Sequence, residues 1–126
     1  MKNNFLLDTH VFIWAMEDNK LLPQGTKNKI ADPNNKIFVS VASIWEIVIK
    51  RNLKKIKVNF DIESSIGKAG IEILAIEASH ALETGKLPPH HKDPFDRMLV
   101  AQAIVEKLTI ITTDEKIKKY DVSVFA

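Results

Sequence analysis

Short apolar runs alternate along the chain with longer segments in which apolar side chains recur every three or four residues. Five runs have the length and composition of buried strands: residues 4–7, 37–39, 71–76, 108–112 and 122–125. The spacing between them predicts helices over residues 9–17, 24–31, 41–55, 62–69, 77–84 and 94–107, and a short helix from Glu115. Strongly apolar strands that alternate with helices are typical of a parallel sheet covered on both faces. We therefore predict an α/β fold with a single domain over residues 1–126.

The composition excludes several classes of protein. With 126 residues and 45% apolar residues, the chain is long enough to bury a core and is not disordered. The absence of cysteine excludes disulfides and thiolate sites. No uncharged run reaches the roughly 18 residues of a membrane helix, and Asp8 interrupts the apolar N-terminus, so we expect a soluble cytoplasmic protein. The formal net charge of +2 does not by itself indicate a nucleic-acid partner.

Two aspartates follow predicted strands. Asp8 comes directly after Leu7, and Asp114 comes after the run that ends at Thr113. In a parallel sheet the carboxyl ends of the strands share one edge, where ligands bind, so we expect these two carboxylates at the same edge. The alternative is that each aspartate only caps the helix after it, because aspartate is a favoured N-cap residue.

Two further acids are predicted to point inward. Glu46 is the only charge in the run from Val39 to Ile49, so it is expected to be at least partly buried. Its alternative role is a salt bridge to Lys50, one turn later. Asp96 begins a helical stripe with Leu99, Val100 and Ala103, which places its carboxylate on the buried face.

Asp93 has a simpler explanation, because it precedes Pro94 and is a good N-cap residue for the helix that starts there.

Four carboxylates from separate elements are thus predicted at inward or strand-end positions: Asp8, Glu46, Asp96 and Asp114. Like charges at close quarters repel and raise one another's pKa values, so such a group needs a cation. Carboxylate oxygens suit Mg²⁺ or Mn²⁺, and acidic sites with these ions hydrolyse phosphodiesters in nucleases. The sequence therefore predicts a divalent-metal site.

At these residues the chain resembles the PIN-domain ribonucleases, and most closely the VapC-type toxins of toxin–antitoxin systems. The matching segments, in order, are Leu6-Leu7-Asp8-Thr9-His10, Ser43-Ile44-Trp45-Glu46-Ile47, His91-Lys92-Asp93-Pro94-Phe95-Asp96-Arg97 and Ile111-Thr112-Thr113-Asp114. Each segment alone would be a weak signal, whereas the ordered set is specific and spans essentially the whole chain.

The resemblance implies a short, mostly parallel central sheet with helices on both faces. It assigns metal binding and catalysis to Asp8, Glu46, Asp96 and Asp114, and accessory roles to Thr112, Asp93 and Arg97. The implied activity is a Mg²⁺- or Mn²⁺-dependent endoribonuclease that cleaves RNA phosphodiesters with a metal-activated water. The implied partners are an RNA substrate, a small antitoxin protein that silences the enzyme, and a second copy in a homodimer.

Several residues have weaker signals. The basic end of the helix after Ser40 offers candidates for RNA contact, although a solvated helix end explains them equally well: Lys50, Arg51, Lys54, Lys55 and Lys57. His90 and His91 lie in a proline-containing loop without a partner at metal-ligand spacing, so we assign them no zinc role. We interpret three large aromatic residues as core or interface residues rather than base-stacking platforms: Phe12, Trp14 and Trp45.

Two alternative functions remain open on the sequence. One is a PIN-like protein that binds RNA without catalysis, or that processes RNA and is not a toxin. The other is a receiver-like domain that accepts a phosphate, although Asp8 lacks the acidic neighbour of such domains and the run 71–76 ends without an aspartate.

The proposed site also changes the interpretation of the net charge. Outside it, 12 of the 16 acidic side chains remain against 18 basic ones, which predicts a basic surface around an acidic pocket.

Overall fold

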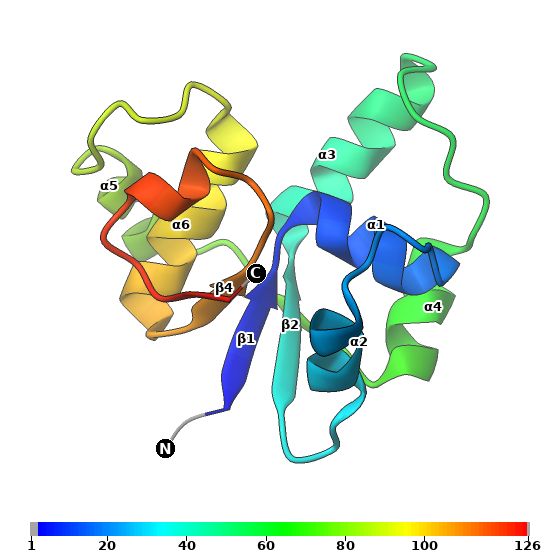
Figure 1. The fold of residues 1–126 in the computed structure, drawn as a ribbon. Coiled ribbons are helices and arrows are strands. Elements are labelled where there is room, and N and C mark those ends of the chain that lie inside the picture. The colour runs from blue at the N-terminus through cyan, green and yellow to red at the C-terminus, as the bar shows by residue number, and fades with distance from the viewer. Residues whose placement is uncertain (1–2, 126) are drawn as a thin grey trace.

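Five short strands form one sheet in the computed structural model, which describes residues 3–125 (Figure 1). The strands are β1 (Asn4–Leu7), β2 (Lys36–Ser40), β3 (Glu72–Leu74), β4 (Thr109–Ile111) and β5 (Val124–Phe125). The helices are α1 (Thr9–Glu17), α2 (Gln24–Ala31), α3 (Val41–Asn52), α4 (Ile62–Ala69), α5 (Ala78–Thr84) and α6 (Pro94–Glu106), with one 3₁₀ turn, η1 (Ile117–Lys119).

The strands are arranged in the order β3-β2-β1-β4-β5, and every neighbouring pair is parallel. The central strand β1 pairs on both sides, so that Leu6 lies opposite Phe38 of β2 and Ile110 of β4. The α/β class and the parallel sheet predicted from the sequence are therefore confirmed. Because all five strands run the same way, their carboxyl ends lie at one edge of the sheet.

Alternate side chains of the strands enter two separate cores. Phe5 and Leu7 of β1 pack in a cluster with Phe12 of α1, whereas Leu6 faces the other side and packs with Leu99 and Val100 of α6. Figure 1 shows α1, α2 and α4 on one side of the sheet and α5 and α6 on the other. This arrangement explains why the strand sequences are almost entirely apolar, since both faces are covered.

Several element boundaries differ from the predictions: β3 and β5 are shorter than the runs 71–76 and 122–125, and two helical segments are also shorter. Helix α3 begins after Ser40, whose hydroxyl accepts a hydrogen bond from the Ala42 N–H as expected of a cap, but it ends at Asn52 instead of residue 55. The chain leaves the helix there, with Lys54 in the left-handed region at φ 58°. The helix expected from Glu115 is only the 3₁₀ turn Ile117–Lys119.

Among residues 3–125, the helices all fall short of the length and apolar character that a membrane crossing requires.

Candidate active site

Asp8 follows β1 directly and is buried, with 4% of its surface exposed. Its Oδ1 accepts a hydrogen bond from the Val11 N–H at 2.7 Å, so the aspartate caps α1 as the simpler alternative predicted. Its Oδ2 accepts a second hydrogen bond from the Thr112 hydroxyl. Burial raises the pKa of Asp8, although both hydrogen bonds act in the opposite direction. Capping therefore fixes the carboxylate in place without removing it from the edge of the sheet.

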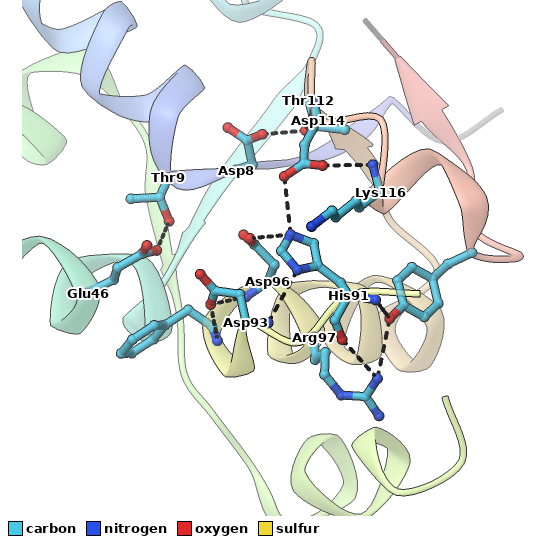
Figure 2. Close-up of polar contacts among 12 residues, drawn as sticks. Asp8, Thr9, Glu46, His91, Asp93, Asp96, Arg97, Thr112, Asp114 and Lys116 are labelled. Atoms are coloured by element: carbon cyan, nitrogen blue, oxygen red, sulfur yellow. Dashed lines mark hydrogen bonds and ion pairs between the residues drawn. The ribbon is translucent and has the colours of Figure 1, made fainter. Parts of the chain in front are cut away.

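Asp114 lies at the same edge, because β1 and β4 are parallel neighbours (Figure 2). Its backbone N–H donates to the Thr112 hydroxyl oxygen at 2.9 Å, and its Oδ1 accepts from the Lys116 N–H at 2.7 Å. Partial burial opposes ionisation, but the Lys116 N–H and the nearby His91 hold the pKa of Asp114 below its usual value. Thr112, expected to be accessory, thus links the two strand-end aspartates.

Asp96 extends from the first turn of α6 toward Asp8 and Asp114 (Figure 2). The preceding Asp93 caps this helix, since its Oδ1 accepts from the N–H groups of Phe95 at 2.8 Å and Asp96 at 3.3 Å. Burial, followed by the charges of the neighbouring carboxylates, raises the pKa of Asp96 to about 8. The acids from β1, β4 and α6 therefore form one electrostatically coupled cluster.

Glu46 is buried on α3 beside this cluster, with 2% of its surface exposed. Its Oε1 accepts a hydrogen bond from the Thr9 hydroxyl at 2.7 Å, and its Oε2 pairs with Lys50 Nζ at 2.6 Å. The salt bridge to Lys50 is thus present, and the hydrogen bond to Glu46 raises the pKa of Lys50. Glu46 still contributes to the raised pKa of Asp96, so it belongs to the same site although both its oxygens have partners.

His91 corrects the interpretation of the proline-containing loop. We expected no partner for its imidazole at metal-ligand spacing, but His91 Nε2 lies 2.9 Å from Asp96 Oδ2 and 3.2 Å from Asp114 Oδ2. Sequence spacing could not show this, because the loop folds back over the start of α6 and Asp114 is distant along the chain. Thr9, which contacts Glu46, was also missed, although it directly follows Asp8.

Arg97, expected to be an accessory site residue, points toward the loop before α6 (Figure 2). Its guanidinium donates to the main-chain oxygens of Thr84 at 2.9 Å and Pro88 at 3.0 Å. These contacts hold the loop before α6 in place.

Of the basic residues at and after the end of α3, Lys50 contacts the site through Glu46. Lys50 faces Glu46 and is partly exposed, and three further basic side chains are exposed: Arg51, Lys54 and Lys55. Of the aromatic residues, Phe12 is fully buried as predicted, but Trp45 is 58% exposed. The Trp45 ring packs edge to face on Phe95, with 5.5 Å between ring centroids. Trp45 is therefore a surface residue beside the acids and not part of the core.

A divalent cation fits these donors. Asp96 and Asp114 each place an oxygen within 4.8 Å of the other's oxygen and of His91 Nε2, and Asp8 lies beside them (Figure 2). Burial and then the neighbouring carboxylates raise the pKa of Asp96 to about 8, so a bound cation would favour its ionised form. Oxygen ligands of this kind favour Mg²⁺ or Mn²⁺.

The fold agrees with comparisons against known proteins. A sequence model of the PIN domain matches residues 5–123. Among solved structures, the chain is similar to DNA-bound VapBC of Salmonella typhimurium (17% identity, TM-score 0.70, covering 99% of this chain and 98% of that chain). It is also similar to VapBC2 of Rickettsia felis bound to a promoter DNA fragment (19% identity, TM-score 0.67, covering 97% of each chain). A third similar structure is FitAcB of Neisseria gonorrhoeae (20% identity, TM-score 0.63, covering 97% of this chain and 96% of that chain). No curated protein matches.

The raised pKa of Asp96 predicts how stability depends on pH without divalent ions. Between about pH 5 and pH 8 the unfolded chain has lost this proton while the folded protein retains it. The folded state binds more protons, so the free energy of unfolding falls as the pH rises. Over these three pH units the decrease is on the order of 4 kcal/mol in the wild type, and we expect Asp96→Asn to remove most of it.

Urea unfolding in EDTA at several pH values, followed by circular dichroism, measures this effect. Asp121→Asn, which removes an exposed carboxylate from a turn after η1, is the matched control and should keep the wild-type slope. An equal pH dependence in wild type and Asp96→Asn would contradict the assignment.

Proposed function

Because the chain belongs to the PIN-domain family, we propose that it is a divalent-metal-dependent endoribonuclease and the toxin of a toxin–antitoxin pair. PIN domains are generally nucleases, which supports hydrolysis of a nucleic acid; RNA as the substrate is the finer part of the proposal. The observation that carries it is the convergence of Asp8, Asp96 and Asp114 at the carboxyl edge of the sheet, with the pKa of Asp96 raised to about 8.

Each acid has a distinct supporting arrangement. Asp8 is fixed by Val11 and Thr112, and Asp114 by the backbone N–H of Lys116, so these two carboxylates need no rearrangement to act as ligands. Asp96 would bind the ion after losing its proton. We assign Glu46 to the edge of the site, where it contributes negative charge and keeps Lys50 close to the acids.

A divalent ion held by these acids would activate a water molecule and stabilise the negative charge that develops on the phosphate. The chain's own residues would do the rest. The carboxylates would orient the ion, and the basic end of α3 would attract the RNA backbone through Lys50, Arg51, Lys54 and Lys55.

The proposed partners follow from the neighbouring folds. One similar structure, from Klebsiella pneumoniae, is described as a toxin–antitoxin complex, and those from Salmonella typhimurium and Rickettsia felis are described as VapBC and VapBC2. We propose an antitoxin protein as the partner of this chain and a homodimer as its assembly. Cleavage of RNA would place its action in the cytoplasm.

The strand order argues against the receiver-like alternative. Receiver domains have the order 2-1-3-4-5, whereas this sheet has the order 3-2-1-4-5 and its edge strand β3 ends without an acid.

We predict that Asp8→Asn and Asp96→Asn each lower RNA cleavage at least about 100-fold, because each removes a charged ligand from the metal site. Both substitutions conserve size and remove carboxylate repulsion, so the fold should be retained. The measurement is cleavage of a fluorogenic single-stranded RNA in Mg²⁺ or Mn²⁺ by protein purified from a ribonuclease-deficient host, with circular dichroism as a check on folding.

Asp121→Asn serves as the control and is expected to cleave like the wild type, while EDTA should abolish cleavage by both. Undiminished cleavage by a purified, folded Asp8→Asn protein would contradict the assignment. RNA binding without any cleavage in Mn²⁺ would instead support a non-catalytic PIN protein.

The toxin role makes a separate prediction in cells. Induced expression of the wild type is expected to arrest growth, and expression of Asp8→Asn at the same level is expected to leave growth unchanged. Colony counts and immunoblots after induction measure both. Normal growth with abundant, RNA-cleaving wild-type protein would favour an RNA-processing role over a toxin.

A further inference from the structure

The imidazole of His91 reaches into the acidic cluster from the loop between α5 and α6. Its Nε2 forms a hydrogen bond with Asp114 Oδ2 at 3.2 Å and lies 2.9 Å from Asp96 Oδ2 (Figure 2). The Nε2 atom thus contacts carboxylates from two separate segments: Asp114 in the loop after β4, and Asp96 in α6. Either a metal ligand or a hydrogen-bond donor could occupy this position.

The other ring nitrogen distinguishes these two roles. His91 Nδ1 accepts a hydrogen bond from the Asp93 backbone N–H at 3.2 Å. A backbone N–H can only donate, so Nδ1 must present its lone pair, and the proton of the neutral ring is on Nε2. In this tautomer Nε2 has no free lone pair for a metal ion and presents an N–H group to Asp96 and Asp114.

The backbone of His91 is fixed as well. Its N–H donates to Tyr120 Oη at 2.9 Å, and its carbonyl oxygen accepts from Arg97 Nη1 at 3.4 Å. Arg97 Nη1 also donates to Tyr120 Oη at 3.3 Å, and Tyr120 itself is buried. Arg97 also donates to the carbonyl oxygens of Thr84, Leu87 and Pro88, which fixes the path of the loop before the histidine.

We propose that His91 is a positioning residue of the active site and not a metal ligand. Its Nε2–H group lies between the Asp96 and Asp114 carboxylates, offsets their repulsion and sets the distance between them, while Arg97 and Tyr120 hold the histidine in place. The inference rests on the proposed function, because it assigns the two carboxylates to a metal site. The proposal also gives Arg97 a role in the site, which is to hold His91 in place.

This arrangement predicts which substitutions preserve the site. Loss of a hydrogen-bonding group that orients metal ligands commonly lowers metal affinity 10- to 100-fold. We expect His91→Ala to lower Mn²⁺ affinity by that factor. His91→Gln keeps an N–H donor at the same reach and is expected to stay within about 3-fold of the wild type. Tyr120→Phe, which removes the acceptor shared by the His91 N–H and Arg97 Nη1 but keeps the imidazole, is expected to give a smaller loss than His91→Ala.

Isothermal titration with Mn²⁺ measures these affinities, and pulsed electron paramagnetic resonance of the bound Mn²⁺ detects directly coordinated nitrogen. Lys92→Gln, an exposed neighbour in the same loop, is the matched control and should bind like the wild type. Nitrogen NMR of the ¹⁵N-labelled imidazole gives a third readout, in which we expect Nε2 protonated and Nδ1 unprotonated both before and after Mg²⁺ is added.

A nitrogen coupling that is present in the wild type and absent in His91→Gln would overturn the proposal in favour of a metal ligand. Wild-type affinity in a folded His91→Ala protein would also overturn it, while RNA cleavage by the wild type would leave the proposed function intact. Absence of Mn²⁺ binding together with absence of cleavage in the wild type would contradict both.

Discussion

Parallel strands end at one edge of their sheet, and in this protein that edge must accommodate carboxylates from three directions within apolar surroundings. Asp8 and Asp114 arrive from neighbouring strands and Asp96 from α6. The chain compensates part of their charge with hydrogen bonds: a helix N-terminus and Thr112 for Asp8, a backbone N–H for Asp114, and the imidazole of His91 between Asp96 and Asp114. Burial and the remaining repulsion between the carboxylates raise the pKa of Asp96 to about 8, which favours its protonated form in the absence of a cation.

Capping does not conflict with the metal-binding role proposed for the same aspartates, because a carboxylate has two oxygens. Asp8 gives one oxygen to the first turn of α1 and the other to Thr112, and Asp114 gives one to the Lys116 N–H and the other to His91. The local contacts that begin a helix or turn therefore also fix the direction of the carboxylate. This dual use explains why the capping alternative, correct for Asp8 and Asp93, did not argue against a functional site.

Much of this could be predicted from the sequence, because it follows from periodicity and strand direction. The apolar runs located all five strands, and parallel pairing of β1 with β4 was enough to bring Asp8 and Asp114 together. The stripe that begins at Asp96 correctly placed Leu99, Val100 and Ala103 in the core, and hence the carboxylate toward the sheet. The position of His91 could not be predicted, since it depends on a loop without periodicity whose path is set by Arg97 and by Tyr120, 29 residues beyond the histidine. For Trp45 the sequence left a core or an interface position open; its exposure excludes the core, because an apolar run in a helix does not show which side remains uncovered.

The central claim is that these acids form a divalent-metal site. Anomalous diffraction from a crystal soaked in Mn²⁺ tests it directly, because the signal locates the ion without assumptions about activity. The account predicts a peak at about 2.0–2.3 Å from carboxylate oxygens of Asp8, Asp96 and Asp114. Ordered, well-defined carboxylates with no anomalous peak at saturating Mn²⁺, or a peak only at another part of the surface, would contradict it.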